Sequence, residues 1–352
     1  LPSPLVAHHA IRPRLLTERI EGRVVVRLVG HARMDSLGVR VGQELTHVDG
    51  IPVERYAEEQ VAPYVSASTV HDREDRVFGR VLLAGAQGRS VRLTLVDADG
   101  TVRTVDAPRD TALAWRRVPP FSLTMRPDSI AVVSLTTFAD ASVVGEFERV
   151  LPSLSRARGL IIDIRENDGG NSRHGWDILA RLIGQPSRTA SWSTPQYRPA
   201  FRSWGRSSGT YREEGARVIP RAPHFPGPVA VLIGRRTFSA AEDFAVAFDV
   251  ARRGPLIGEP TGGSTGNPIS LRLPGGGHAR ICAKDDRYPD GRTFVGVGVQ
   301  PTIAVVRTIA DLRAGRDATL ERAVEALTRP RVRTPVRGAR GARAAATMSA
   351  SR

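Results

Sequence analysis

Short apolar runs without polar alternation are the feature that most constrains the fold of this chain. Two of them cover residues 160–164 and 228–234, and the first is interrupted by a single Asp. A strand with one face in water alternates polar and apolar residues, so continuous runs predict strands that are buried on both faces. Apolar residues recur at helical spacing over residues 143–154 and again over residues 240–251. Buried strands alternating with amphipathic helices predict an α/β core.

The N-terminal third has a different pattern. Strand-like segments and turns alternate over residues 24–108, and Asp99-Gly100 between two of these segments is a strong hairpin signal. Residues 41–50, in which a Gly-containing turn leads into a strand ending at Asp-Gly, resemble a PDZ domain, and a charged helical insertion interrupts the module over residues 54–85. We predict a β-rich, PDZ-like domain that adds an extended peptide to a sheet edge. The alternative is a β-rich spacer without a ligand.

Length and composition indicate a globular protein of two domains. The chain has 352 residues, of which 41% are hydrophobic and 25% charged, and no apolar stretch approaches the roughly 18 residues of a membrane span. Because the sequence begins Leu1-Pro2, with neither Met nor a leader, we expect a processed chain or a fragment. The single cysteine, Cys282, excludes an internal disulfide and a cysteine-rich metal site. We expect no metal and no other cofactor.

The formal net charge of +15 raises the question of nucleic-acid binding. Much of this charge lies in residues 329–352, which contain seven arginines and no acid. Their Gly, Ala, Ser and Pro content is typical of disorder, and no aromatic residues are interleaved to stack on bases. We therefore interpret residues 329–352 as a basic disordered tail and expect no specific nucleic-acid binding.

Ser239 lies where a buried strand turns into a helix. A serine at the first turn of a helix is next to unpaired backbone N–H groups, which can stabilise developing negative charge. This position suits a nucleophile. The same residues, Ser239-x-x-Glu242, also form a capping box, in which the serine only satisfies backbone donors. Taken alone, the segment favours capping over catalysis.

A second segment combines a buried strand with an Asn-Asp-Gly-Gly turn over residues 167–170. Adjacent glycines let a backbone N–H face a substrate with no side chain in the way. A donor from Gly169 or Gly170, together with the N–H of Ala240, would make a two-donor oxyanion hole. An ordinary Gly-Gly turn has the same sequence.

A catalytic serine needs a base. The chain has one lysine, Lys284, which lies in a charged hairpin directly before Asp285 and Asp286. A surface lysine next to two aspartates keeps its proton and is a poor base. Eight histidines remain as candidates. His174 follows the Gly-Gly turn, the pair His8-His9 precedes the PDZ-like module, and His71 has no evident role; spacing alone does not choose among them.

Four segments in this order resemble the C-terminal processing, or tail-specific, serine peptidase superfamily. They are residues 160–170, residues 237–242, residues 258–263 (Gly-Glu-Pro-Thr-Gly-Gly) and residues 288–301. The resemblance extends over about residues 125–328 and implies a ClpP/crotonase-like core preceded by a PDZ domain. It also implies a polypeptide substrate, and we favour an extracytoplasmic location over a cytoplasmic one.

The resemblance also suggests a branch of the superfamily. Processing peptidases have a lysine about 25 residues after the serine, but Ser264 stands at the matching position. The form of residues 258–263 is nearer to tricorn core domains and interphotoreceptor retinoid-binding modules. In tricorn-like enzymes the base is a histidine upstream of the PDZ domain, which matches His9, with His8 replacing an assisting serine. The family's glutamate matches Val295, so Glu259 and Asp285 are candidates for the acid that orients the base.

The resulting domain prediction has four parts: an N-terminal segment with the catalytic His (1–22), a PDZ-like domain (23–110), a peptidase core (111–328) and the tail (329–352). The functional prediction is a serine endopeptidase in which His9 activates Ser239 and an acyl-enzyme forms. The alternative is a catalytically inactive relative that binds a peptide or an apolar ligand, motivated by Val295 and His8. A basic adaptor acting through the tail is a third class, but it explains none of the core motifs.

Overall fold

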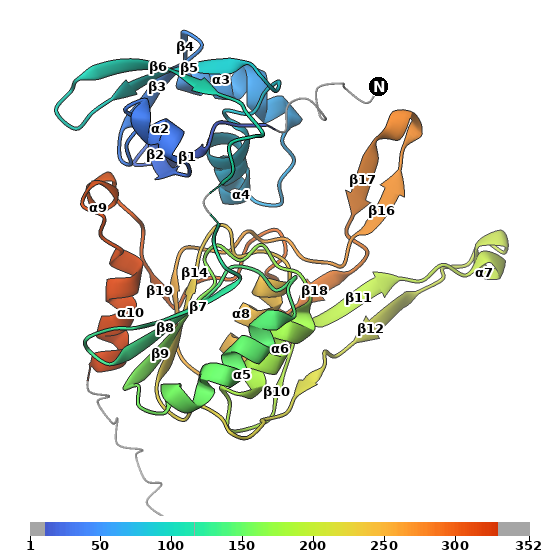
Figure 1. The fold of residues 1–352 in the computed structure, drawn as a ribbon. Coiled ribbons are helices and arrows are strands. Elements are labelled where there is room, and N and C mark those ends of the chain that lie inside the picture. The colour runs from blue at the N-terminus through green and yellow to red at the C-terminus, as the bar shows by residue number, and fades with distance from the viewer. Residues whose placement is uncertain (1–10, 116, 330–352) are drawn as a thin grey trace, which may run out of the picture.

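The computed structural model describes residues 11–115 and 117–329, which form a mixed α/β protein of two lobes. The smaller, N-terminal lobe lies against one end of the larger core lobe (Figure 1). The candidate residues His8 and His9 and nearly all of the predicted tail lie outside the described residues.

The N-terminal lobe is built on a six-stranded antiparallel sheet in the order β1-β2-β3-β5-β6, with β4 paired to β3. Its strands are β1 (Leu15–Ile20), β2 (Arg23–Val29), β3 (Glu44–Val48), β4 (Ile51–Pro52), β5 (Ser90–Val96) and β6 (Val102–Pro108). The β5–β6 hairpin turns at Asp99-Gly100, as the sequence predicts, because Gly100 adopts the left-handed φ of 88° that this turn requires. The sheet begins earlier than predicted, since β1 lies within the segment assigned to residues 1–22.

Helical turns occupy the insertion between β4 and β5. They are α3 (Val53–Tyr56), the π-helical turn η1 (Ala57–Val61), the 3₁₀ turn η2 (Ala62–Tyr64), α4 (Val70–Glu74) and the π-helical turn η3 (Asp75–Val81), and α2 (Ala32–Ser36) follows β2. The apolar side chains of the insertion and sheet share one core, to which Leu15, Leu45, Val77 and Leu93 contribute. The helical insertion is thus an integral part of the lobe.

The core lobe contains a second six-stranded sheet in the order β19-β15-β14-β9-β8-β7. Its strands are β7 (Phe121–Met125), β8 (Ile130–Leu135), β9 (Gly159–Asp163), β14 (Val229–Ile233), β15 (Leu256–Gly258) and β19 (Ile303–Ala304). All neighbours are parallel except β7 and β8. Parallel strands need helical crossovers, and these place the loops of interest at the carboxyl ends of the strands.

Helices cover both faces of this sheet, which explains the uninterrupted apolar runs. One face packs against α5 (Ser142–Leu154), α6 (Ser172–Ala180) and α8 (Ala240–Val250). The other packs against α10 (Ala318–Thr328), which follows α9 (Ile309–Arg313). Alternate residues of β14 therefore enter different cores, Val231 on the first face and Leu232 on the second, and both are fully buried.

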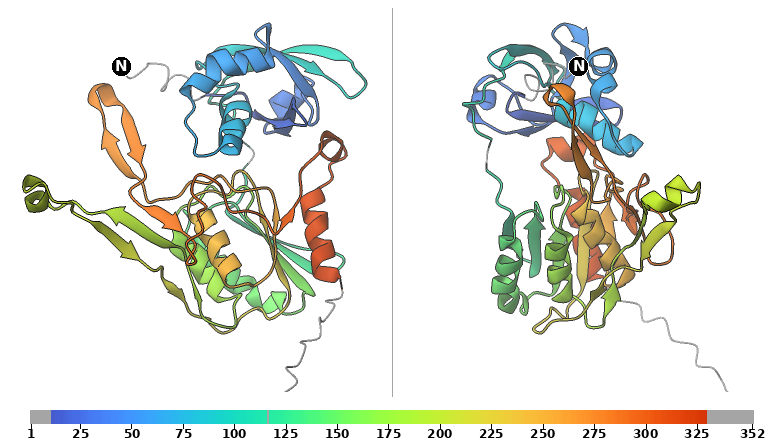
Figure 2. Two further views of the ribbon diagram at one scale, coloured as in Figure 1. Left: turned by 180° about the vertical axis from the view of Figure 1, so that it is seen from behind. Right: turned by 90° about the vertical axis from the view of Figure 1, so that its right-hand side faces the viewer.

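Two antiparallel projections leave the core lobe (Figure 2). The first corresponds to the polar excursion at about residues 190–226 and contains β11 (Ser191–Pro195), α7 (Pro199–Ser203) and β12 (Thr210–Glu213), with β11 also paired to β18 (Asp285–Arg287). The second is the hairpin of β16 (Ile269–Arg272) and β17 (His278–Ile281), joined through the 3₁₀ turn η4 (Pro274–Gly276). The short pair β10 (Ser187–Arg188) and β13 (Arg217–Val218) completes the fold. No helix in the described part of the chain is long and apolar enough to cross a membrane.

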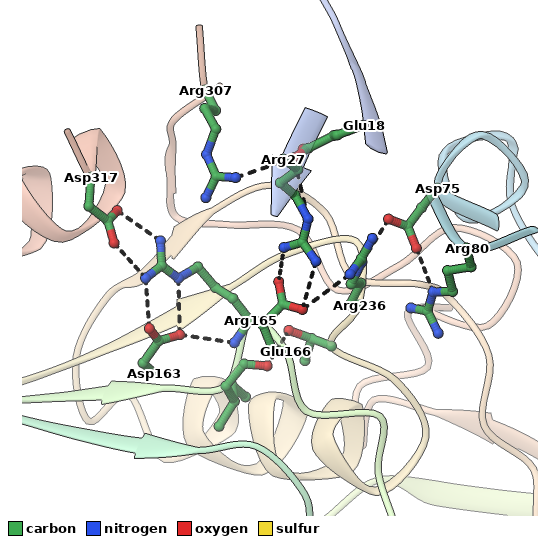
Figure 3. A network of polar contacts seen from close by, with 12 residues as sticks. Glu18, Arg27, Asp75, Arg80, Asp163, Arg165, Glu166, Arg236, Arg307 and Asp317 are labelled. Atoms are coloured by element: carbon green, nitrogen blue, oxygen red, sulfur yellow. Dashed lines mark hydrogen bonds and ion pairs between the residues drawn. The ribbon is translucent and has the colours of Figure 1, made fainter. Parts of the chain in front are cut away.

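Ion pairs connect the lobes in a network that Figure 3 shows. Arg236 of the core contacts Asp75 at 2.8 Å, and Arg27 of the N-terminal lobe contacts Glu166 at 2.8 Å. Arg307 similarly reaches Glu18 at 3.2 Å. Several of these side chains are largely buried, and loss of one partner from such a pair leaves an uncompensated charge at a cost of about 3–5 kcal/mol. The network therefore favours one relative orientation of the lobes.

Candidate active site

Ser239 lies in a sharp turn between β14 and α8. Thr237 fixes the turn, since its buried hydroxyl donates to the carbonyl of Ile164 at 2.8 Å and accepts the N–H of Gly234 at 3.0 Å. Ser239 has φ 55° and ψ −121°, an unusual conformation for a residue with a side chain. Such strain costs about 1–3 kcal/mol and is concentrated at functional sites. The turn thereby places a half-buried serine directly at the N-cap of α8.

Glu242 connects this serine to the following loop. Its buried carboxylate accepts the hydroxyl of Thr261 at 2.5 Å and the N–H groups of Gly263 at 2.7 Å, Ser264 at 2.8 Å and Ser239 at 3.2 Å. Burial raises the pKa of Glu242 to about 7, while these hydrogen bonds oppose the increase. The predicted capping box is present. However, the sequence did not indicate that its glutamate also holds residues 261–264 against the helix.

The Gly-Gly turn meets Ser239, as the sequence suggests. A Cβ added at Gly169, which has φ +101°, would lie 2.8 Å from Cβ of Ser239 and 3.0 Å from the backbone nitrogen of Ala240. A Cβ at Gly170, which has φ +135°, would lie 2.1 Å from the backbone nitrogen of Ala139. Both positions therefore exclude a side chain, and their close packing brings the turn against the serine.

The N–H groups of the two glycines in this turn differ in their hydrogen bonding. The N–H of Gly169 donates to Oδ1 of Asn167 at 3.0 Å, whereas its carbonyl accepts the N–H of Phe138 at 2.7 Å. Within residues 11–115 and 117–329, neither the N–H of Gly170 nor that of Ala240 has a hydrogen-bond partner. Of the two glycines proposed as oxyanion donors, Gly170 is thus the one whose N–H is unengaged, and it is also exposed.

Two histidines lie near the site, and each is bound to a backbone carbonyl. Nδ1 of His174, in the first turn of α6, is 2.8 Å from the carbonyl oxygen of Phe138. Nε2 of His71, in α4 of the N-terminal lobe, donates to the carbonyl of Thr261 at 2.6 Å. His71 is therefore not incidental, contrary to the sequence interpretation, because it contacts the loop that Glu242 holds. The position of His9 lies outside the described residues.

The two carboxylates proposed to orient the base occupy different surroundings. Glu259 forms an ion pair with Arg235 at 2.9 Å, and its burial raises its pKa. Asp285 is exposed on β18 and pairs with Arg287 at 2.9 Å. The structure records no hydrogen bond between either carboxylate and Ser239 in the part of the chain that it describes.

Lys284 differs from the expected surface lysine. Its side chain is 22% exposed, pairs with Asp286 at 2.8 Å and lies 5.3 Å from the ring centre of Trp192. Ser264, which the sequence resemblance matches to the lysine of processing peptidases, accepts the N–H of Ser239 through its backbone carbonyl at 3.0 Å. The residue matched to that lysine therefore lies next to Ser239, but it is a serine.

Asp243 is a second buried carboxylate, which the sequence did not reveal. Asp243 accepts the hydroxyl of Ser172 at 2.5 Å and is 6% exposed. Burial raises its pKa to about 6, opposed by the bond from Ser172 and by the charge of Lys284. The signal available in the sequence was a second acidic residue directly after Glu242 in an otherwise apolar helix. No cluster of three or more His, Cys, Asp or Glu side chains in the described ranges is arranged to hold a metal ion.

The N-terminal lobe contacts the serine turn directly. Thr69 donates its hydroxyl to the carbonyl of Gly262 at 3.1 Å, and the guanidinium of Arg76 lies 5.3 Å from the ring centre of Phe238. Next to the Gly-Gly turn, a cavity of 330 Å³ lies between the lobes, with walls from both. Its lining includes Arg12 and Arg80 from the N-terminal lobe and Thr137 and Asp168 from the core lobe.

Comparison with known proteins places this geometry in a family. The sequence model of peptidase family S41 matches residues 129–305, which is half of the chain and includes Ser239 and the Gly-Gly turn. The chain belongs to peptidase family S41. This family is one of serine peptidases, and so of hydrolases, which is the enzyme class that the sequence indicates.

Two curated relatives support this assignment. The chain is 28% identical over 301 residues to the putative tricorn protease homolog 2 of Streptomyces coelicolor, covering 82% of this chain and 22% of the relative. It is 24% identical over 272 residues to the chloroplastic C-terminal processing peptidase of Tetradesmus obliquus, covering 76% of this chain and 53% of the relative. The predicted resemblance to the C-terminal processing superfamily is confirmed. The chain spans about a fifth and about half of the length of these relatives.

Solved structures share the fold. Mature CPAF complexed with lactacystin matches with a TM-score of 0.69 and 16% identity, covering 91% of this chain and 83% of that one. A putative peptidase from Parabacteroides merdae matches with a TM-score of 0.53 and 23% identity, covering 60% and 65%. The predicted α/β class is confirmed at the level of this shared mixed fold.

Proposed function

We propose that the protein is an endopeptidase that cleaves unstructured polypeptides through an acyl-enzyme on Ser239. The observation that carries the proposal is the packing of the strained serine against the Gly-Gly turn at Gly169, together with the unengaged N–H groups of Ala240 and of the adjacent Gly170. Preorganised donors at a developing oxyanion commonly supply about 3–4 kcal/mol each to transition-state stabilisation. A capping serine alone needs neither the strained backbone nor the second donor segment.

In this mechanism His9 removes the proton of the Ser239 hydroxyl as Oγ attacks the peptide carbonyl carbon. The oxyanion accepts hydrogen bonds from Gly170 and Ala240. The carbon–nitrogen bond then breaks, and the leaving amine takes the proton from His9. Water attacks the ester carbonyl, gives its proton to His9 and releases the acid as the proton returns to Ser239.

The position of Arg12 makes His9 a feasible base. Arg12 lines the cavity between the lobes together with Thr137, whose hydroxyl donates to the carbonyl of Gly169 at 3.2 Å. Three residues of chain span at most about 11 Å, which limits how far His9 can be from Arg12. The N-terminal lobe, in the PDZ-like role proposed from its sequence, presents the end of the substrate by backbone pairing.

Labelling with a fluorophosphonate, which reacts with an activated serine, tests the proposal. Wild type is expected to be labelled, and Ser239→Ala and His9→Ala to lose labelling while unfolding at the wild-type temperature. Ser264→Ala is the matched serine control and should still be labelled. Loss in His174→Ala but not in His9→Ala would transfer the role of base to His174. An unlabelled but folded wild type would contradict catalysis and favour a relative that binds peptide without cleaving it.

A further inference from the structure

The two projections from the core lobe expose large hydrophobic side chains to solvent. Three of these side chains lie on the first projection, namely Tyr197, Trp204 and Tyr211. Four lie on the second projection, namely Ile269, Leu271, Leu273 and Ile281. Both projections extend from the same side of the core lobe (Figure 1). Exposed apolar side chains that gather in this way mark an interaction surface, whereas single ones scattered over a protein do not.

The tip of the first projection combines aromatic rings with arginines. Trp204 directly follows α7 and is 63% exposed, and its ring centre lies 6.1 Å from that of Phe201. The guanidinium of Arg206 lies 5.8 Å from the ring centre of Trp204, and that of Arg198 lies 5.3 Å from the ring centre of Phe201. Residues 191–212 contain four arginines and no acid. All four are exposed, and none forms an ion pair with another residue that the structure describes.

The second projection is a hairpin with one apolar and one basic face. Residues directly opposite each other in an antiparallel pair lie on the same face. The register places on one face the pairs Ile269–Ile281 and Leu271–Ala279, and on the other face the pairs Ser270–Arg280 and Arg272–His278. Residues 267–284 contain no acid. Because a two-stranded hairpin alone is marginally stable in water, its exposed apolar face favours contact with a partner.

The chemistry of both projections matches a membrane surface with anionic lipids. Anionic headgroups attract exposed arginines, and the boundary below them accepts Trp, Tyr and aliphatic side chains. The phosphates of a nucleic acid would match the arginines but not the Ile and Leu side chains of the second projection. A second copy of this chain, which has a net charge of +15, would bring like charges together. A broad surface is also one that two separate projections can contact at once (Figure 2).

We propose that the two projections dock the protein on a membrane surface that carries anionic lipids. The arginines contact the lipid phosphates, and the aromatic and aliphatic side chains enter the boundary between headgroups and acyl chains. Docking holds the core lobe at the membrane surface, so that substrates are selected by their location. The inference goes beyond the proposed peptidase function and does not depend on it.

Co-sedimentation of the 352-residue chain with lipid vesicles measures docking. Phosphatidylcholine vesicles with about 30% phosphatidylglycerol should bind the protein at least tenfold more tightly than vesicles of phosphatidylcholine alone. About 0.5 M NaCl should remove most of this difference, because salt screens the attraction between arginines and headgroups. Equal binding to both kinds of vesicle, or binding to neither, would overturn the inference.

Variants assign docking to the projections. Each arginine near an anionic surface strengthens binding about fivefold, so the double variant Arg202→Gln/Arg206→Gln should bind the anionic vesicles at least tenfold more weakly. The matched control is Arg156→Gln/Arg158→Gln in the exposed loop between α5 and β9, which loses the same charge and should bind as wild type does. Equal weakening in both double variants would show an effect of net charge alone and overturn the inference.

Quenching of tryptophan fluorescence by brominated lipids reports insertion directly. Trp204→Phe should remove the quenching, whereas Trp176→Phe, in α6 of the core lobe, should retain it. Quenching that persists in Trp204→Phe would contradict insertion of the tip.

The remaining outcomes identify other partners, and each would overturn the inference. Vesicle binding that is lost only when residues 330–352 are removed would assign it to the basic tail. Binding to a single-stranded oligonucleotide but not to vesicles would indicate nucleic acid. A dimer that Trp204→Ser dissociates, again without vesicle binding, would indicate a second copy, as light scattering would show. Fluorophosphonate labelling without vesicle binding refutes docking alone, whereas vesicle binding by folded, unlabelled protein refutes the peptidase function alone.

Discussion

Replacement of Glu242 by Gln tests how the catalytic turn is held together. In the wild type each carboxylate oxygen accepts two donors: Oε1 those of Thr261 and Gly263, and Oε2 those of Ser264 and Ser239. The amide keeps one oxygen. If its NH₂ group replaces Oε1, the hydroxyl of Thr261 can reverse and accept, so one backbone N–H, that of Gly263, remains unpaired. An unpaired buried donor costs about 1–3 kcal/mol.

Titration of Glu242 adds a dependence on pH. Its pKa is about 7 in the folded protein and 4.5 without burial. Between these values the folded state binds more protons than the unfolded state, so the stabilisation from Glu242 is complete below the lower value and is lost as pH rises through about 7. The difference corresponds to about 3 kcal/mol in the free energy of unfolding. Gln does not titrate, so the variant lacks this pH-dependent contribution to the free energy of unfolding.

The expected result is a crossover in stability. At about pH 5 Glu242→Gln should be less stable than wild type, and by about pH 8 the difference should have disappeared or changed sign, while the titrations of all other groups cancel in the comparison. Urea unfolding at fixed pH values measures both free energies. Glu321→Gln, in the exposed first turn of α10, is the control and should differ from wild type by a small constant. A constant difference for Glu242→Gln would refute the reasoning.

Two further predictions concern the contacts around this turn. Gly169→Ala should reduce fluorophosphonate labelling at least tenfold, because the added Cβ would lie 2.8 Å from Cβ of Ser239. Gly145→Ala in α5 is the control: its Cβ would meet no atom within 4 Å, so labelling should not change. Equal labelling of both variants would argue against the close packing. Burial raises the pKa of Asp75, but its ion pairs with Arg236 and Arg80 outweigh burial and lower the pKa overall. The stabilisation from ionised Asp75 is present above its ordinary pKa and is lost as pH falls through the lowered value. Asp75→Asn should therefore lower the free energy of unfolding by about 3–5 kcal/mol near pH 7 and by progressively less in acid, as measured by urea unfolding. A loss of stability that does not change with pH would contradict the pairing.

The elements that follow from local sequence were predictable. The apolar run at residues 228–234 contains β14 (Val229–Ile233), since burial on both faces permits no polar residue. Ser239 at the start of α8 and its proximity to Gly169 were also expected, because the carboxyl ends of parallel strands lie together. The contact of His71 was not identifiable, because it depends on how one lobe lies against the other, and no periodicity in the sequence encodes this.

Residues 261–264 are held from two sides, and this limits how modular the protein is. Glu242 binds this loop from within the core, while Thr69 and His71 bind it from the N-terminal lobe. A Cβ at Gly263 would lie 2.5 Å from Cγ2 of Thr69, so the two surfaces fit without space for substitution. The smallest portable catalytic unit therefore includes the helical insertion as well as the α/β core. Exchange of N-terminal lobes between relatives would have to transfer the loop and the insertion as one part.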